Sequence, residues 1–203
     1  MDIVGPFPKA ARNKKYLLVG TDYFTKGVEA EPLANIRDVD VKKFLWKNIV
    51  TRFGISHTLI LDNGLQFDSK SFRRYCCELG ITNRYSTPAY PKGNEQVETV
   101  NKVIVSGLKK RLDDAKGRWM EELPHVLWTC RITPRRSIEE TPFSMSYEAK
   151  AVIPTEIGFP TLRTTQSFNP NDNDKLLERS LDLIEERRKN AMVQLVYYQH
   201  KLK

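Results

Sequence analysis

Three carboxylates stand where the surrounding residues are expected to fix their positions. Asp2 opens an extended Asp-Ile-Val-Gly-Pro segment, Asp62 follows the apolar run His57–Leu61, and Glu98 falls in the first turns of a helical pattern. Ligand sites in α/β sheets lie beside the carboxyl ends of strands, so neighbouring strands would bring Asp2 and Asp62 together. Two close carboxylates repel each other unless a cation neutralises them. An all-oxygen set of this kind suits Mg²⁺ or Mn²⁺.

Basic residues accompany Glu98 along its predicted helix. Lys102 and Lys109 lie near the same face as Glu98, because residues three or four apart share a helix face. Two metal ions on such carboxylates would hold the attacking and leaving oxygens of a displacement at phosphorus, while the lysines bind a DNA backbone. The pattern therefore indicates phosphodiester chemistry. Spacing alone leaves open that all three carboxylates are ordinary solvated groups, since the chain has 25 acidic residues.

The composition favours a polyanionic partner. The 203 residues include 33 Lys and Arg against 25 Asp and Glu, which gives a net charge of +8. With 40% hydrophobic and 29% charged residues, the chain has the composition of a globular protein with a buried core. The length predicts one full domain with a few dozen further residues. Nucleic acid is the expected partner, ahead of a membrane surface.

Several classes of protein are disfavoured by what the sequence lacks. No apolar run reaches the ~18 residues of a membrane span, and the first residues do not form a secretory signal. Cys76, Cys77 and Cys130 do not make a disulfide framework, and neither they nor the three histidines have zinc-site spacing. We therefore expect a nuclear or cytoplasmic protein, neither secreted nor membrane-bound, without a small-molecule cofactor.

Alternating strands and helices are predicted to position the carboxylates. Apolar patterns predict strands over Lys15–Phe24 and Lys26–Leu33, joined by a hairpin at Thr25–Gly27. A helix follows, capped by Asp38 or Asp40 and ending before Gly54, and then a strand over His57–Leu61. The next predicted elements are a helix over Ser69–Leu79, closed by Gly80, and a strand over Ile81–Tyr85. A long helix after Asn94 and a helix over Trp119–Arg131 complete the predicted domain. This order predicts an α/β domain with a mixed sheet.

The C-terminal third has a different pattern. Pro-rich loops are predicted up to about Pro170, and an amphipathic helix from Asn171 onward. The apolar stripe of this helix includes Met192, Leu195 and Val196. We expect it to form a helical appendage to the domain.

Several segments resemble the integrases of gypsy-type LTR retrotransposons. Asp2 in MDIVGPFP, Asp62 in LILDNGLQF and Glu98 in YPKGNEQVETVNK resemble the catalytic D, D, E motif of retroviral and retrotransposon integrases. Between the second and third carboxylates lie 35 residues, the gap typical of that family. YLLVGTDYFTKGVEAEPL and TPFSMSYEAKAVIPTEIG extend the resemblance over most of residues 1 to about 190.

The resemblance implies an RNase H-like three-layer α/β fold, with a five-stranded mixed sheet flanked by helices. It implies an integrase catalytic core in residues 1–160, followed by a linker and a long amphipathic C-terminal helix in residues 161–203. It also implies a homo-oligomer whose partners are the ends of the retroelement DNA and the target DNA, and hence a nuclear location.

The resemblance assigns roles to individual residues. Asp2, Asp62 and Glu98 are the expected ligands of two Mg²⁺ or Mn²⁺ ions in a metal-dependent polynucleotidyl transferase, which processes 3′ ends and transfers strands. Asn101 and Lys102 match the Asn-Lys pair that follows the family's glutamate. The expected DNA contacts are Asn101, Lys102, Lys109 and Arg111.

Two departures from the family pattern favour an alternative. Glu95 replaces a glycine three residues before Glu98, and the chain begins one residue before Asp2, so that we expect a short first strand prone to fray. The alternative is an inactive remnant that only binds nucleic acid or oligomerises. An RNase H-type nuclease is disfavoured by the 35-residue gap and the TPFSMSYEAKAVIP segment. Asp22 in TDYFTK also ends a strand, but by the match it belongs to the second strand, away from catalysis.

Overall fold

The computed structural model describes residues 1–62, 64–85, 106–107, 110, 118–135, 137–147, 151, 183 and 185–198. The chain divides into two compact units, which are described separately. Unit 1 comprises Met1–Tyr23 and Val28–Cys130, and unit 2 comprises Phe24–Gly27 and Arg131–Lys203. Within the described ranges, none of the helices has the length and apolar content of a membrane-spanning segment.

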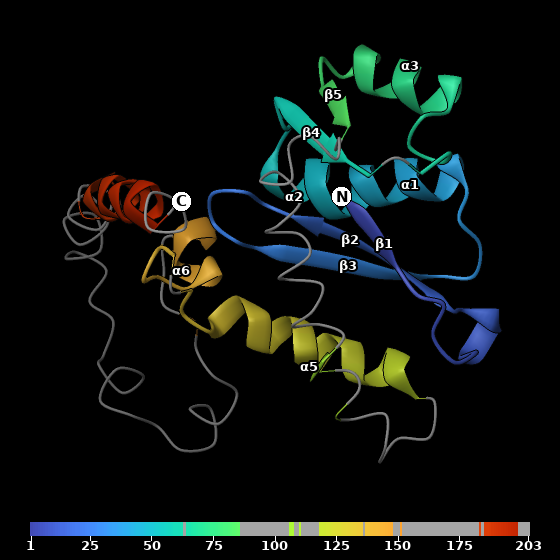
Figure 1. The fold of residues 1–203 in the computed structure, drawn as a ribbon, viewed down its shortest axis with the longest axis horizontal. Helices are drawn as coiled ribbons and strands as arrows, with labels where there is room; N and C mark the ends of the chain where they lie inside the picture. Colours follow the sequence, from blue (N-terminus) through green and yellow to red (C-terminus); the bar gives the residue numbers. More distant parts are fainter. Residues whose placement is uncertain are drawn as a thin grey trace, which may run out of the picture. The chain divides into compact units, whose positions relative to one another are not determined.

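An antiparallel sheet of three strands begins unit 1 (Figure 1). Its strands, in the order β1-β2-β3, are β1 (Asp2–Val4), β2 (Tyr16–Thr21) and β3 (Val28–Leu33). Asp2 is opposite Val19, and Thr21 is opposite Val28. The predicted hairpin is confirmed, although both strands are shorter than predicted. Lys26 has a left-handed backbone with φ 59°, which is incompatible with an extended strand at that residue.

A helical segment of three parts follows the sheet. The α-helix α1 (Asp38–Phe44) continues as a π-helical stretch, η2 (Leu45–Val50), and ends as α2 (Thr51–Phe53). The segment stops at Gly54, where φ is +87°, which confirms the predicted end. Its buried residues Val41, Phe44 and Leu45 belong to the core of the unit.

The predicted N-cap of this helix is wrong. Arg37, and neither Asp38 nor Asp40, occupies the N-cap position, and no side chain caps the helix. Asp40 pairs instead with the Arg37 guanidinium at 2.8 Å, and the Asp38 carboxylate accepts a hydrogen bond from the Val39 N–H. Both carboxylates therefore bind local partners within the first turn.

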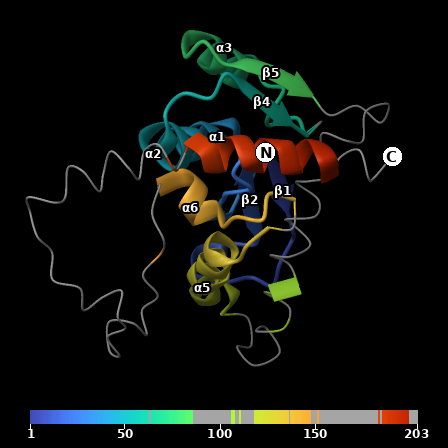
Figure 2. The same ribbon diagram turned by 90° about the vertical axis from the view of Figure 1, so that its left-hand side faces the viewer.

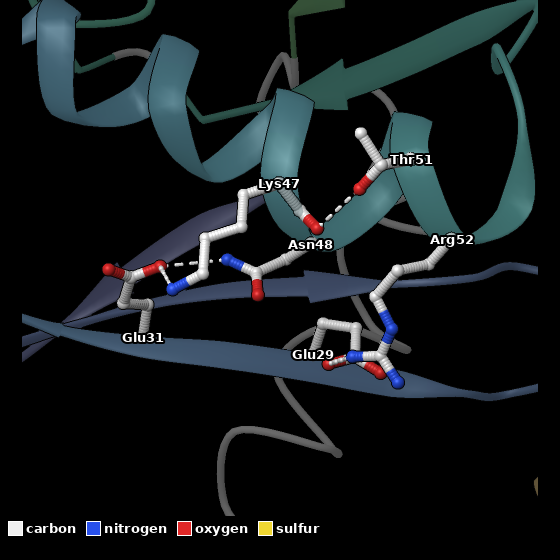
Figure 3. Close-up of polar contacts among 6 residues, drawn as sticks. All are labelled: Glu29, Glu31, Lys47, Asn48, Thr51 and Arg52. Atoms are coloured by element: carbon white, nitrogen blue, oxygen red, sulfur yellow. Dashed lines mark hydrogen bonds and ion pairs between the residues drawn. The ribbon is translucent and has the colours of Figure 1, made fainter.

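Polar contacts connect this helical segment to β3 (Figure 3). Arg52 forms an ion pair with Glu29 at 2.6 Å. Glu31 accepts a hydrogen bond from the Asn48 side-chain amide at 2.8 Å, and the Lys47 ammonium lies 3.8 Å from the same carboxylate. Glu29 and Glu31 are two residues apart on the strand and therefore point to the same face of the sheet.

A parallel pair of strands forms the second sheet of unit 1. β4 (Thr58–Leu61) pairs with β5 (Thr82–Tyr85), and α3 (Lys70–Glu78) connects them. The Ser69 side chain caps α3 by accepting a hydrogen bond from the Phe72 N–H, and Gly80 follows the helix with φ +71°. These predicted elements are confirmed, each with slightly shifted ends.

Two hydrophobic clusters cover the two faces of the three-stranded sheet. Leu18 of β2 belongs to a cluster with Phe44, Leu61 and Phe72, which α1, β4 and α3 contribute. Leu17 and Val19, which point the other way, pack with residues of α5 (Trp119–Ile132), among them Trp119. Figures 1 and 2 show α1 and α5 on opposite sides of this sheet. Unit 1 is therefore a layered α/β structure, as predicted.

Unit 2 contains a helix in a region predicted as loop. α6 spans Pro142–Tyr147, so the loop prediction is wrong there. Thr141 explains the helix, because its hydroxyl oxygen accepts a hydrogen bond from the Ser144 N–H at 3.0 Å. Pro142 occupies the first helical position, where its fixed φ is favourable and its missing N–H has no cost.

The C-terminal helix is described over residues 185–198. Ala191 and Leu195 are buried in a cluster with Ile138 and Met145. Met192 and Val196, which belong to the same predicted apolar stripe as Leu195, are 56% and 49% exposed. They follow Ala191 and Leu195 by one residue, which turns them about 100° around the helix. The predicted domain boundary at residue 160 lies outside the described residues and stays a prediction.

Candidate active site

Met1 connects the two sheets of unit 1. Its N-terminal ammonium donates a hydrogen bond to the Ile60 carbonyl oxygen, and its own carbonyl oxygen accepts one from the Asp62 N–H at 3.4 Å. Met1 thus exchanges both bonds with the residues on either side of Leu61, which is the pattern of a parallel pair. Met1 is 8% exposed, β1 is as short as expected, and the fraying of this strand stays a prediction.

This pairing makes Asp2 and Asp62 neighbours. Because Met1 lies opposite Leu61, the next residues along the two parallel chains, Asp2 and Asp62, also lie opposite each other. The side chains of Met1 and Leu61 are buried in the same hydrophobic cluster. Alternation along a strand turns Asp2 and Asp62 away from that cluster, toward the face that α5 covers. The structure therefore brings together two of the three predicted catalytic carboxylates.

The pKa of the N-terminal ammonium is affected by burial and by the charges of both carboxylates. Burial lowers the pKa of the Met1 ammonium from 8.0 to about 6, while the charges of Asp2 and of Asp62 act in the opposite direction. Most of the amine is therefore neutral at pH 7, and no sequence pattern indicated its bond to Ile60.

The two carboxylates differ in their local surroundings. Asp2 is half-buried, and its Oδ1 accepts a hydrogen bond from the Ile3 N–H at 2.7 Å. Asp62 is exposed just beyond the end of β4. Both side chains carry carboxylate oxygens, which are hydrogen-bond and metal acceptors. This donor set suits a hard cation such as Mg²⁺ or Mn²⁺.

The other predicted site residues lie outside the described residues. Within the described ranges, no group of three His, Cys, Asp or Glu residues is placed to hold a metal ion. Those site residues are Glu98, Asn101, Lys102, Lys109 and Arg111. Their catalytic, metal-binding and DNA-binding roles stay predictions, as do those of Asp2 and Asp62.

Residues that sequence reasoning set aside have unremarkable positions. Asp22 is exposed immediately after β2, as the family match predicted. His57 and His125 are exposed. Trp119 is fully buried against Phe7 and belongs to the core of unit 1.

Comparison with known proteins relates this geometry to a family. Residues 1–91 match the model of the integrase core domain. The sequence relatives are retroviral. The chain is 31% identical over 144 residues to the Gag-Pol polyprotein of avian reticuloendotheliosis virus, and 31% identical over 159 residues to that of gibbon ape leukemia virus. These alignments cover 71% and 78% of the chain but 12% and 9% of the viral polyproteins.

Solved integrase structures share the fold. The catalytic core domain of HTLV-2 integrase in complex with magnesium aligns with a TM-score of 0.58 at 21% identity, covering 72% of this chain and 93% of that domain. A chain of the simian T-cell lymphotropic virus intasome, in complex with PP2A regulatory subunit B56 gamma, aligns with a TM-score of 0.63 at 21% identity, covering 75% of this chain and 54% of that one. The α/β fold is therefore of the RNase H-like integrase type.

Proposed function

We propose that this chain carries the catalytic core of a retroelement integrase, a polynucleotidyl transferase that joins the ends of element DNA to target DNA. The observation that supports it most directly is the parallel pairing of Met1 with Leu61, which makes Asp2 and Asp62 neighbours at the carboxyl end of β4. The match of residues 1–91 to the integrase core domain supports the same reaction. The segments quoted above further suggest a gypsy-type element.

The proposal includes one mixed sheet in the order β3-β2-β1-β4-β5. The structure has these five strands in two sheets, and the two hydrogen bonds of Met1 support their union through β1 and β4. In that arrangement β1 is central. Its first carboxylate, Asp2, then stands between the antiparallel half and the parallel half of the sheet.

Asp2, Asp62 and Glu98 would hold two Mg²⁺ or Mn²⁺ ions. When bound, such ions lower the pKa of a coordinated water or hydroxyl and neutralise charge that develops on phosphate oxygens. The chain's own residues supply anionic oxygens and fix their positions. The Ile3 N–H orients the Asp2 carboxylate, and the end of β4 sets the position of Asp62. Glu98 would complete the set from the long helix predicted by the sequence.

DNA is the proposed partner, and assembly into a homo-oligomer and a nuclear location accompany this role. The net charge of +8 supports binding to a polyanion. The proposed DNA contacts beside the glutamate are Asn101, Lys102, Lys109 and Arg111.

Strand joining on a branched DNA substrate with Mn²⁺ tests this function. We expect joining by the chain, and its loss in Asp2→Asn, Asp62→Asn and Glu98→Gln variants, which keep the shape of each side chain. The matched control is Asp22→Asn, which removes a carboxylate that directly follows a neighbouring strand. Joining that survives Asp62→Asn would refute the assignment. DNA binding without joining by any version would favour the inactive remnant.

A further inference from the structure

The loop between β1 and β2 is strongly basic. From Ile3 to Thr21 the chain has no acidic residue, whereas the segment from Lys9 to Lys15 has four cations. These are Lys9, Arg12, Lys14 and Lys15, referred to below as the basic loop. Lys9 and Arg12 are exposed, and Lys14 and Lys15 are half-buried.

The cations of the basic loop lack acidic partners, unlike many cations of the helices. Arg37, Arg52 and Arg74 each pair with a carboxylate within 2.9 Å. In the part of the chain that the structure describes, none of the four basic-loop cations forms an ion pair. Lys15 instead lies over the ring of Tyr16, 5.2 Å from its centroid. No described acidic residue of unit 1 therefore neutralises their positive charge.

The backbone of the loop is held in one conformation. The Phe7 N–H donates to the Lys15 carbonyl oxygen at 2.6 Å, and the Ala10 N–H donates to that of Lys14 at 2.9 Å. The Trp119 indole N–H donates to the Pro8 carbonyl oxygen at 2.9 Å, and the Trp119 ring lies 4.9 Å from that of Phe7. These bonds attach both ends of the loop to each other and to the start of α5.

The tip of the loop is conformationally strained. Arg12 and Asn13, in the short helical turn η1 (Ala11–Asn13), have φ of 58° and 56°. An arginine rarely adopts this left-handed region, which costs about 1 kcal/mol or more. The bonds on both sides of the tip maintain it, so the backbone that carries the cations is held in place.

The basic loop lies at the opposite end of β2 from the carboxylates. Val19 of β2 is opposite Asp2, and Lys15 precedes β2 four residues earlier. At about 3.3 Å per residue, Lys15 is about 13 Å along the strand from the residue opposite Asp2. This corresponds to about four base-pair steps of B-DNA, which rise about 3.4 Å each.

We propose that the basic loop is a second nucleic-acid surface, which binds the phosphate backbone of duplex DNA several base pairs away from the reacting phosphate. This inference rests on the proposed function in taking DNA as the substrate. Fixed, unneutralised cations bind phosphates and release counterions whatever the base sequence. The surface therefore supplies affinity and orientation rather than sequence preference.

Duplex DNA fits this surface better than an anionic membrane. Peripheral membrane binding combines cations with exposed aromatic or aliphatic side chains that enter the lipid. The loop's single phenylalanine, Phe7, packs on Trp119, and none of the exposed large hydrophobic residues lies between Ile3 and Tyr16.

A salt titration of DNA binding tests the inference. The variant is Lys9→Gln/Arg12→Gln, and the matched control is Arg73→Gln/Arg74→Gln on α3, which removes two exposed arginines already paired with Asp68 and Glu78. Both change the net charge by the same amount. All proteins carry Asp62→Asn and are measured in EDTA on a 24-base-pair duplex, so that binding is separated from reaction.

We expect the loop variant to weaken binding about tenfold at 0.15 M salt, and to lower the slope of log K against log salt by about 1.8, for two lost phosphate contacts. The control should change affinity less than twofold. The exchange Lys9→Arg/Arg12→Lys should restore wild-type binding. Equal weakening by loop variant and control, or no weakening by the loop variant, would overturn the inference. Loss of binding to phosphatidylserine vesicles with unchanged DNA binding would also overturn it, in favour of a membrane.

Strand joining by the otherwise unaltered chain is measured in parallel. If the chain joins strands but the loop variant binds DNA with unchanged affinity, the inference fails while the proposed function stands. If DNA binding depends on the loop but the chain does not join strands, the inference stands while the proposed function fails. The DNA surface then exists on a chain that is not an active integrase.

Discussion

Arg52 and Glu29 form an ion pair of 2.6 Å that connects α2 to β3 (Figure 3). The Glu29 side chain is 9% exposed and that of Arg52 is 35% exposed. A carboxylate so poorly hydrated depends on nearby donors and cations for its charge to be tolerated. This contact therefore secures the helical segment 38–53 to the sheet that carries Asp2.

Replacing Arg52 should destabilise the fold. Arg52→Met keeps the apolar volume but removes the guanidinium from the Glu29 carboxylate. We expect a loss of about 2–3 kcal/mol in the free energy of unfolding, below the usual cost of breaking a fully buried pair because Arg52 is partly solvated. Urea denaturation measures it. Arg74→Met, which breaks an exposed pair with Glu78 on α3, should cost about 0.5 kcal/mol or less. Equal effects of the two variants would contradict this account.

The stability of the chain that begins at Met1 should rise between pH 6 and pH 8. The pKa of the Met1 ammonium is about 6 in the folded protein and 8.0 when unperturbed. Between pH 6 and pH 8 the unfolded chain binds more protons at this amine than the folded protein does. The free energy of unfolding therefore has its full value above pH 8 and decreases as the pH falls to 6. Two pKa units correspond to about 3 kcal/mol. Urea midpoints in EDTA measure this change, and an Nα-acetylated chain, which cannot titrate there, should lack it. A free-amine chain with the same pH profile as the acetylated one would refute the prediction.

Thr21 should tolerate the loss of its hydroxyl. Its Oγ1 is buried without a hydrogen-bond partner at the end of β2, so its desolvation is uncompensated. Thr21→Val keeps the shape and removes the buried oxygen, and we expect a gain of about 1 kcal/mol. The control is Thr141→Val, which removes the oxygen that accepts from the Ser144 N–H and should cost about 1 kcal/mol. Thermal melts of both variants compare them, and a destabilising Thr21→Val would show that the hydroxyl has a favourable interaction.

Local patterns predicted most of the elements of unit 1. The apolar runs before Asp62 and Ile81 correspond to strand and turn as expected, and Ser69 and Gly80 mark the two ends of α3. Each of these signals concerns residues close together in the sequence. The predicted N-cap at Asp38 or Asp40 shows the limit of such local signals. Asp40 lies inside the helix, and its carboxylate pairs with Arg37.

The candidate site depends on contacts that no local pattern contains. Asp2 and Asp62 become neighbours through the bonds of Met1 to Ile60 and Asp62, about 60 positions away in the sequence. Met1 and Leu61 also pack in one cluster, a contact between distant residues that periodicity does not reveal. The sequence did hold a sign of the basic loop, since Lys9 to Lys15 stand in a stretch without acidic residues.

Trp119 should control both stability and the fixed geometry of the basic loop. Trp119→Phe keeps an aromatic ring in the core but removes the N–H that donates to the Pro8 carbonyl oxygen. We expect a loss of about 2 kcal/mol, from the smaller ring and the unpaired carbonyl. Hydrogen exchange should accelerate at the Phe7 and Ala10 amides, which close the loop. The control is Trp46→Phe, at a tryptophan that is 50% exposed. It should change neither the free energy of unfolding nor the exchange at Phe7 and Ala10.

The same variant separates loop geometry from loop charge. Trp119→Phe leaves Lys9, Arg12, Lys14 and Lys15 in place, so net charge is unchanged and any loss of DNA affinity comes from their looser arrangement. Cations on a mobile loop lose conformational entropy on binding, whereas a preorganised loop does not. We therefore expect a few-fold weaker DNA binding together with faster exchange at Phe7. Faster exchange with unchanged affinity would show that the charges act without fixed positions, and unchanged exchange would show that the Trp119–Pro8 bond does not hold the loop.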